Sequence, residues 1–233
     1  MNTIARITSD LEKRKTDSTF RELAQPNNLI DFSSNDYLGL AQNTRLIDRV
    51  KWKFEKATNQ TLGSGGSRLL SGNYKELEDL EQLLVDVHGK ESALVFNSGY
   101  VANLAVFSTI PKKSDTILYD DLIHTCIKEG ARLSFAKHQS FRHNDLKDLK
   151  RKISLAQGNV FVAVESVYSM DGDFAPLASL ASLCNDTGAH LIVDEAHSTG
   201  VFGNKGAGLV SQLRLDDKVF LKIHTFGKGI GVH

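Results

Sequence analysis

The sequence contains only two cysteines, Cys126 and Cys184, which lie far apart and form no CxxC pair. They are expected to be reduced thiols of a cytoplasmic protein, and a metal site is not expected. The net charge is zero, with 28 basic and 28 acidic residues, so neither a broad nucleic-acid footprint nor a membrane surface is expected. No apolar run approaches the length of a membrane span, and the N-terminus has no signal-peptide core.

Two regions of the chain differ in character. Residues 1–42 are predicted to form an N-terminal arm and connector, and residues 43–233 the main domain. Within the main domain, the glycine-rich stretch "GSGGSRLLSG" separates a helix that begins near Thr44 from the helical pattern "YKELEDLEQLLVDVH". Asn73 is the expected N-cap of that second helix, and Gly89 its expected end.

Short apolar runs alternate with helical patterns after Ser92. The predicted strands are residues 93–96, 116–119, 132–136, 160–165, 190–195 and 219–223. They show little polar alternation, which is typical of strands covered by helices on both faces. The sequence therefore predicts an α/β fold with a mostly parallel sheet and flanking helices. Ligands of such sheets bind beyond the carboxyl ends of the strands.

Polar residues follow most of these predicted strands, and each has an ordinary structural explanation when taken alone. Ser98–Tyr100 begins a helix and offers N–H groups to an anion, but it is also a common type of turn. His124 also begins a helix, where a lone histidine is often structural. Asp194 ends an apolar strand, where a carboxylate needs a cationic partner unless it caps the next helix, and His197 follows it.

The remaining strand ends add hydroxyl groups and a lone lysine. Ser166–Asp173 is rich in hydroxyls, although its Asp-Gly pair also favours a tight turn. Thr225 and Lys228 follow the last run, and Lys228 lies among glycines in "TFGKGIG". Taken together, the strand ends fit pyridoxal 5'-phosphate (PLP). This cofactor needs a lysine for its Schiff base, an acid at its pyridine nitrogen, and donors for its phosphate and phenolic oxygen.

The order of the motifs resembles that of the α-oxoamine synthases, over nearly the whole chain. The motifs are "DFSSNDYLGL", "GSGGSRLLSGN", "NSGYVAN", "DDLIHTCIKEG", "FRHNDLKDL", "ESVYSMDGDFAPL", "VDEAHSTGVFG" and "HTFGKGIG". Members of this family are PLP-dependent enzymes of fold type I, the aspartate-aminotransferase-like fold. The resemblance implies the same fold for this chain, with the active site at the interface of a homodimer lined by the Gly63–Gly72 loop.

The resemblance also implies roles for individual residues. Lys228 would bind the cofactor covalently and move protons, Asp194 would pair with the pyridine nitrogen, and His124 would stack on the ring and touch the substrate. The other implied cofactor contacts are Gly99 and Tyr100 near the phosphate, His197 at the phenolic oxygen, and Ser169 and Thr225 as donors. The further substrate contacts are Asn35 and Arg21, the latter at the distal carboxylate of the acyl substrate.

The reaction implied is a decarboxylating condensation of an amino acid with an acyl thioester. The motifs are most similar to those of the member that joins L-alanine to pimeloyl-CoA, or to a pimeloyl carrier protein, in biotin synthesis. A sibling activity that uses glycine and another acyl-CoA is the first alternative. The second is an inactive fragment.

Two departures from the family pattern stand out. Cys126 occupies a position near His124 where relatives usually have serine, a stronger hydrogen-bond donor. Family members also continue beyond the lysine with a last sheet strand and a C-terminal small domain, which carries the arginine for the amino-acid carboxylate. The expectation is that the small domain is missing, and that these 233 residues alone do not catalyse the condensation.

Overall fold

The computed structural model describes residues 2–23, 29–57 and 63–232. They belong to two compact units, Met1–Ser33 and Ser34–His233. The first unit contains helix α1 (Thr3–Thr16), which begins at Asn2, whose side chain accepts a hydrogen bond from the Ile4 amide. α1 buries none of its residues within its own unit.

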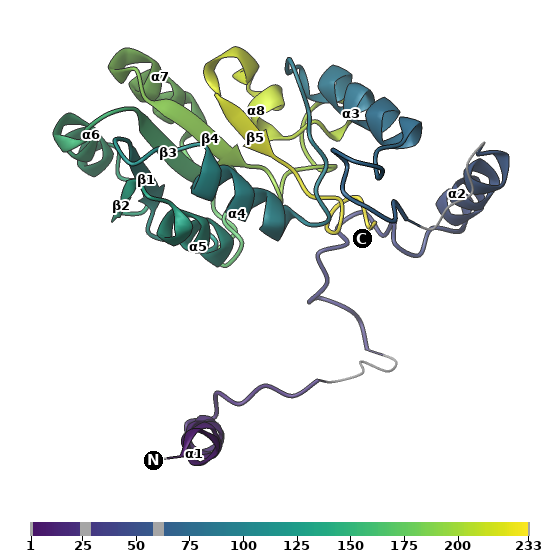
Figure 1. Cartoon of the computed structure of the whole chain (residues 1–233), viewed down its shortest axis with the longest axis horizontal. Helices are drawn as coiled ribbons and strands as arrows, with labels where there is room; N and C mark the ends of the chain where they lie inside the picture. The colour runs from purple at the N-terminus through teal and green to yellow at the C-terminus, as the bar shows by residue number, and fades with distance from the viewer. Residues whose placement is uncertain (1, 24–28, 58–62, 233) are drawn as a thin grey trace. The chain divides into compact units, whose positions relative to one another are not determined.

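The second unit is built around a five-stranded parallel sheet with the strand order β2-β1-β3-β4-β5 (Figure 1). The strands are β1 (Thr116–Asp120), β2 (Lys137–Phe141), β3 (Val160–Glu165), β4 (His190–Asp194) and β5 (Leu221–Ile223). The helices are α2 (Thr44–Lys56), α3 (Lys75–His88), α4 (Gly99–Thr109), α5 (Thr125–Leu133), α6 (Leu146–Leu155), α7 (Leu177–Thr187) and α8 (Leu209–Gln212), with 3-10 turns at Asn204–Gly206 and Asp216–Lys218.

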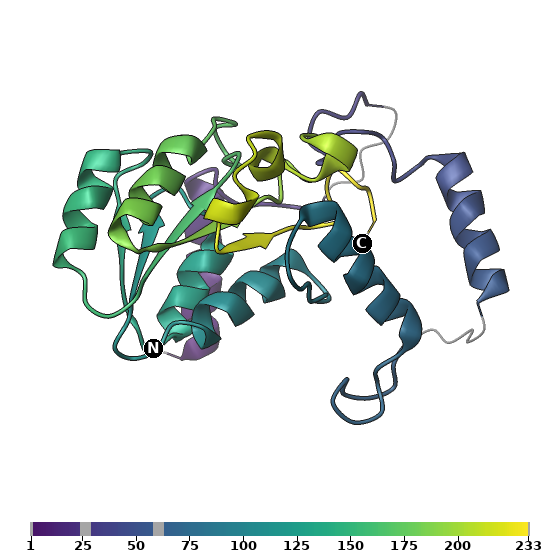
Figure 2. The same cartoon turned by 90° about the horizontal axis from the view of Figure 1, so that it is seen from above.

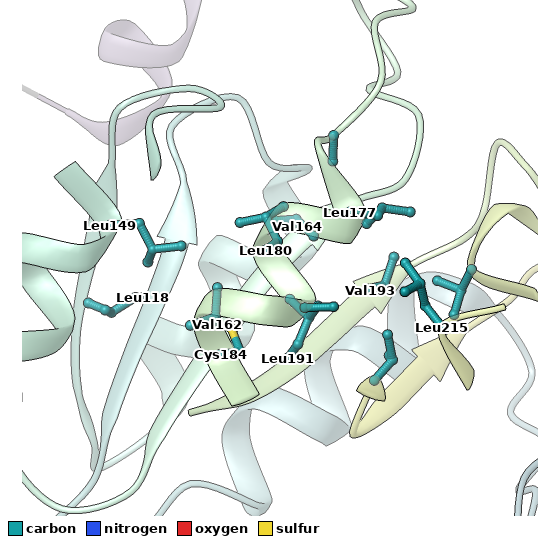
Figure 3. Close-up of a cluster of buried hydrophobic side chains, with 14 of the residues drawn as sticks. Leu118, Leu149, Val162, Val164, Leu177, Leu180, Cys184, Leu191, Val193 and Leu215 are labelled. Atoms are coloured by element: carbon teal, nitrogen blue, oxygen red, sulfur yellow. The ribbon is translucent and has the colours of Figure 1, made fainter. Parts of the chain in front are cut away.

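Both faces of the sheet are buried, because alternate residues of each central strand enter different apolar clusters. Val162 and Val164 of β3 pack with Leu149 of α6 and Leu180 of α7, as Figure 3 shows. The neighbouring Phe161 and Ala163 face the opposite way, where the cluster includes Phe107 of α4 and Ile127 of α5. Helices therefore cover the sheet on its two sides (Figure 2), which confirms the predicted α/β architecture and its continuous apolar strands.

Two of the predicted strands are wrong. Residues 93–96 belong to no strand, and the Val95 amide donates to Glu81 Oε1 at 2.8 Å instead of joining a ladder. This segment and β5 both line a cavity of about 600 Å³, and among the described residues no strand pairs with the outer edge of β5. Residues 132–136 are also not a strand, because α5 continues to Leu133 and β2 begins only at Lys137.

The glycine-rich loop is held to α3 by a charged contact that replaces the predicted cap. Asn73 is not the N-cap, which is Tyr74. The Asn73 side chain instead accepts from Arg68, whose guanidinium binds both Glu81 oxygens at 2.6 and 3.0 Å. Gly89 ends α3 as predicted, in the left-handed conformation at φ 59°.

The helices of the described residues include none with both the length and the apolar character that a membrane crossing requires.

Candidate active site

The carboxyl ends of the parallel strands bring most of the predicted site residues to one edge of the sheet. Asp194 ends β4, His197 lies in the turn that follows it, and Thr225 and Lys228 follow β5. The helix starts at Gly99 and His124 lie at the same edge, because Gly99 approaches Thr225 and the His124 amide donates to Glu165 at the end of β3. Parallel strands therefore bring together groups that are up to 129 residues apart in the chain.

A chain of polar contacts begins at the lysine amine. Lys228 Nζ lies 2.8 Å from His197 Nε2, and His197 Nδ1 lies 2.6 Å from the Tyr37 hydroxyl. The Tyr37 hydroxyl donates its proton to Asn35 Oδ1 at 3.1 Å, so it can only accept a hydrogen bond from His197. His197 must then donate through Nδ1 and accept from the lysine through Nε2, as a neutral imidazole.

The charge states of this chain agree with that assignment. Burial, with the nearby charges of Lys228 and His124, lowers the pKa of His197 to about 4. Burial also lowers the pKa of Lys228 below its ordinary value, although the carboxylates of Asp194 and Glu165 act in the opposite direction. The amine is therefore easier to deprotonate than a lysine in water, which favours its use as a nucleophile or base.

Asp194 is buried and fixed by two donors. Its Oδ2 accepts from Asn103 Nδ2 at 2.8 Å, and its Oδ1 accepts from the Ala196 amide at 2.8 Å. It faces Glu165 across the ladder of β3 and β4. Burial, and then the charge of Asp194, raises the pKa of Glu165 to about 7. The geometry thus places one firmly held carboxylate beside a second one that is easily protonated.

His124 caps α5 through its own ring, since Nδ1 accepts from the Cys126 amide at 3.2 Å. The Cys126 thiol lies 2.9 Å from the same nitrogen, and burial raises the pKa of this thiol to about 12. The thiol therefore keeps its proton and donates it to His124, so in this structure the cysteine supports the histidine. Burial lowers the pKa of His124, so its neutral ring carries its proton on Nε2.

The start of α4 approaches the chain after β5 very closely. A Cβ atom at Gly99 would lie 3.3 Å from Thr225 Cβ. This contact is tighter than usual, so a larger residue at this position would require Thr225 to shift slightly. Ser98 caps this helix by accepting from the Val101 amide, and the Tyr100 ring lies edge-on to His124 with centroids 6.3 Å apart. The first turn of α4 thus presents its N–H groups beside Thr225, in an arrangement that suits an anion.

The remaining predicted site residues are Ser169, Asn35 and Arg21. Ser169 is exposed in the turn after β3, and its backbone N–H donates to Glu165. Asn35 is linked to the site through Tyr37, whose hydroxyl it accepts from. Arg21 is exposed within the unit Met1–Ser33, and it stays a prediction as a substrate contact.

Sequence reasoning missed three residues that the fold brings to this edge. Asn103 is buried one turn inside α4 and holds Asp194, and Glu165 lies at the end of β3. Tyr37 lies 160 positions before the histidine that it contacts. The polar Asn103 in the apolar helix "GYVANLAVFST" was the available signal, because a buried amide requires a partner.

The donor set fits PLP when it is tested group by group. A lysine amine of lowered pKa lies in contact with a neutral histidine, and a buried carboxylate ends the adjacent strand. The side-chain-free Gly99 lets the N-terminal turn of α4 meet Thr225. Among the described residues, no three His, Cys, Asp or Glu side chains are grouped to hold a metal ion.

Comparisons with known proteins agree with this assignment. Residues 27–233 match the family model described as aminotransferase class I and II. The 8-amino-7-oxononanoate synthase of Emericella nidulans is 43% identical over 227 residues, which cover 89% of this chain and 54% of that protein. The chain thus spans about half the length of the curated relatives it matches.

Two solved structures show the same fold. A serine palmitoyltransferase from S. paucimobilis with bound PLP is 27% identical, with a TM-score of 0.86 over all of this chain and 62% of that one. The 8-amino-7-oxononanoate synthase of Francisella tularensis is 32% identical, with a TM-score of 0.72 over 88% of this chain and 56% of that one. The observed fold is therefore that of the PLP-dependent aminotransferase-like enzymes.

Proposed function

Because this chain belongs to the aminotransferase class I and II family, we propose that it forms the cofactor-binding part of a PLP-dependent C-acyltransferase. The proposed reaction joins L-alanine to pimeloyl-CoA, or to a pimeloyl carrier protein, with loss of CO₂, and yields 8-amino-7-oxononanoate. The observation that carries the proposal is the contact of 2.8 Å between Lys228 Nζ and His197 Nε2 next to the buried Asp194. The names of the curated relatives support the choice of reaction.

The residues that would hold PLP are those of the described sheet edge. Lys228 would attach it, Asp194 would face its pyridine nitrogen, and His197 would contact its phenolic oxygen. Further contacts are proposed for Gly99, Tyr100, His124, Ser169 and Thr225. The chemistry that PLP supplies when bound is an electron sink for negative charge at the α-carbon of the amino acid.

The chain's own residues would manage the protons of the reaction. Lys228, with its lowered pKa, would remove the α-proton and later return it. His197 and Tyr37 form a relay whose direction can reverse. The Tyr37 hydroxyl can turn its proton from Asn35 to His197 Nδ1. The His197 imidazole then carries its own proton on Nε2 and becomes a donor there. Asp194 is held in position by hydrogen bonds from Asn103 and the Ala196 amide.

The choice of substrate is tested by product analysis. The experiment uses the complete holoenzyme, of which this chain would form the cofactor-binding part. It is supplied with pimeloyl-CoA and either L-alanine or glycine, and the products are identified by mass spectrometry. We expect 8-amino-7-oxononanoate from L-alanine, formed at least about tenfold faster than the homologous product from glycine, because one added methyl group discriminates on that scale. A preference for glycine would instead support a sibling synthase, and no product with either amino acid would contradict the proposal.

We also propose that the holoenzyme is a homodimer with the loop of residues 63–72 at its interface. Leu69 and Leu70 of this loop are adjacent in the chain and 95% and 88% exposed, and neighbouring exposed apolar side chains are a feature of contact surfaces, whereas a single one is not. We expect Leu70→Asp to shift the sedimenting mass from dimer to monomer, while Phe135→Asp, at the opposite edge of the sheet, leaves the dimer intact. A loop variant with the dimeric mass would reject this interface.

A further inference from the structure

His143 is held between two carboxylates at the same edge of the sheet. It follows β2, and its Nδ1 lies 2.8 Å from Asp120 Oδ1 at the end of β1. Its Nε2 lies 2.8 Å from Asp173 Oδ2, in the turn after β3. None of these three residues belongs to the proposed catalytic set, so their arrangement calls for an explanation of its own.

Counting hydrogens shows what this arrangement requires. A carboxylate oxygen only accepts, so each ring nitrogen that meets one must carry a proton. The side-chain nitrogen of Asn144, Nδ2, also lies 3.1 Å from His143 Nε2. It has better acceptors, however, in Asp173 Oδ2 at 2.9 Å and the Phe174 carbonyl at 3.3 Å. Both contacts of His143 are therefore satisfied only by the doubly protonated imidazolium.

The carboxylate on the far side of His143 belongs to the turn that presents Ser169. Asp173 closes this turn with its carbonyl, which accepts from the Tyr168 amide at 2.9 Å. Val167 and Phe174 form an antiparallel bridge at the base of the same turn. Asp120, in contrast, is completely buried, and its carboxylate also accepts from the backbone N–H groups of Leu122 and Asn144. His143 therefore connects the turn after β3, where Ser169 is exposed, to a buried carboxylate at the end of β1.

We propose that protonated His143 acts as a pH-dependent clamp that positions the Ser169 turn by holding Asp173 to Asp120. Loss of one proton leaves the imidazole with one donor, so one of the two carboxylate contacts is lost. If His143 Nε2 is the nitrogen that loses its hydrogen, the side-chain Nδ2 of Asn144 can donate to it and gives up its hydrogen bond to the Phe174 carbonyl. The link to catalysis rests on the proposed role of Ser169 as a cofactor donor, but the clamp itself does not.

The direction of the pH dependence follows from the surroundings of His143. Partial burial lowers its pKa, but hydrogen bonds to Asp120 and Asp173, and their charges, outweigh this and raise the pKa above 6.5. Among the described residues, the charged groups that act on the ring are Asp120 and Asp173. Tyr168 meets the ring edge-on with centroids 4.6 Å apart, and Arg142 pairs with Asp145. The clamp is thus complete below pH 6.5 and is lost as the pH rises through the raised pKa.

The first test is the titration of His143 by NMR, followed through its ring carbons and nitrogens in the purified protein without added cofactor. We expect a pKa above the ordinary histidine value of 6.5. His138, which is exposed on β2, is the reference histidine. Asp173→Asn should lower the pKa of His143 and leave that of His138 unchanged. A His143 pKa at or below the ordinary value, or one insensitive to Asp173→Asn, would overturn the proposal.

The second test measures the turn itself by hydrogen exchange. After correction for the intrinsic rate, protection of the Tyr168 amide should fall by about tenfold as the pH rises through the pKa of His143, the scale of one lost charged hydrogen bond. In His143→Gln the protection should no longer vary with pH, while His138→Gln should behave as wild type. A turn whose protection in wild type does not change with pH would contradict the clamp, whatever the protein catalyses.

Discussion

Replacing Asp194 with asparagine is expected to leave the protein folded and to slow α-proton exchange from L-alanine by about 10³-fold. The substitution keeps the size of the side chain but removes the negative charge that would face the pyridine nitrogen. An amide could not keep that nitrogen protonated, so bound PLP would be a weaker electron sink in this variant.

The measurement is the exchange of the α-proton with deuterated solvent, followed by NMR in the holoenzyme. Asp121→Asn is the matched control, because this exposed carboxylate lies at the same edge of the sheet, directly after β1. The control should exchange at the wild-type rate, and the unfolding temperatures of both variants should remain close to that of wild type. Wild-type exchange in Asp194→Asn would show that the carboxylate has only a structural role.

Replacing Lys228 with arginine is expected to abolish turnover, with a loss of at least about 10³-fold. Arginine preserves the positive charge and much of the length, but its guanidinium stays protonated and can neither form the covalent link nor accept the α-proton. The contact with His197 can persist in this variant, so the loss separates proton transfer and attachment from simple charge pairing.

The control for that variant is Lys218→Arg, in the exposed turn before β5. Turnover of L-alanine with pimeloyl-CoA should be unaffected there. Lys222→Arg is not a suitable control, because Lys222 Nζ is bound to Asp216 at 2.6 Å and to the His88 carbonyl. Retention of wild-type turnover in Lys228→Arg would remove this lysine from the mechanism.

The central strands and their polar ends could be predicted from the sequence, because strands that are buried on both faces consist of continuous apolar residues. β3 matches the apolar run at 160–165, and β4 matches the run that begins at His190 except for its last residue, Glu195. The order of the strand ends was then enough to gather Asp194 and Lys228 at one edge. These predictions depend only on short-range pattern and on the general behaviour of parallel sheets.

The errors arise where neighbours in space, not in sequence, decide the outcome. β2 is an edge strand with the polar sequence "KHQSF", so it lacks the apolar signal, which lay instead in the preceding helix end. Residues 93–96 have the composition of a strand but find Glu81 in place of a ladder partner. The contacts of Asn103 and Tyr37 join residues 91 and 160 positions apart, beyond the reach of any local pattern.

The central claim is that PLP attaches to Lys228, and borohydride reduction of the PLP-loaded protein tests it most directly. Reduction makes a lysine–pyridoxal link permanent, and peptide mass mapping then identifies the modified residue. We predict the pyridoxyl mass on Lys228, the amine that contacts His197 and has a lowered pKa. Finding that mass on Lys222 or Lys218 with Lys228 unmodified would contradict the account.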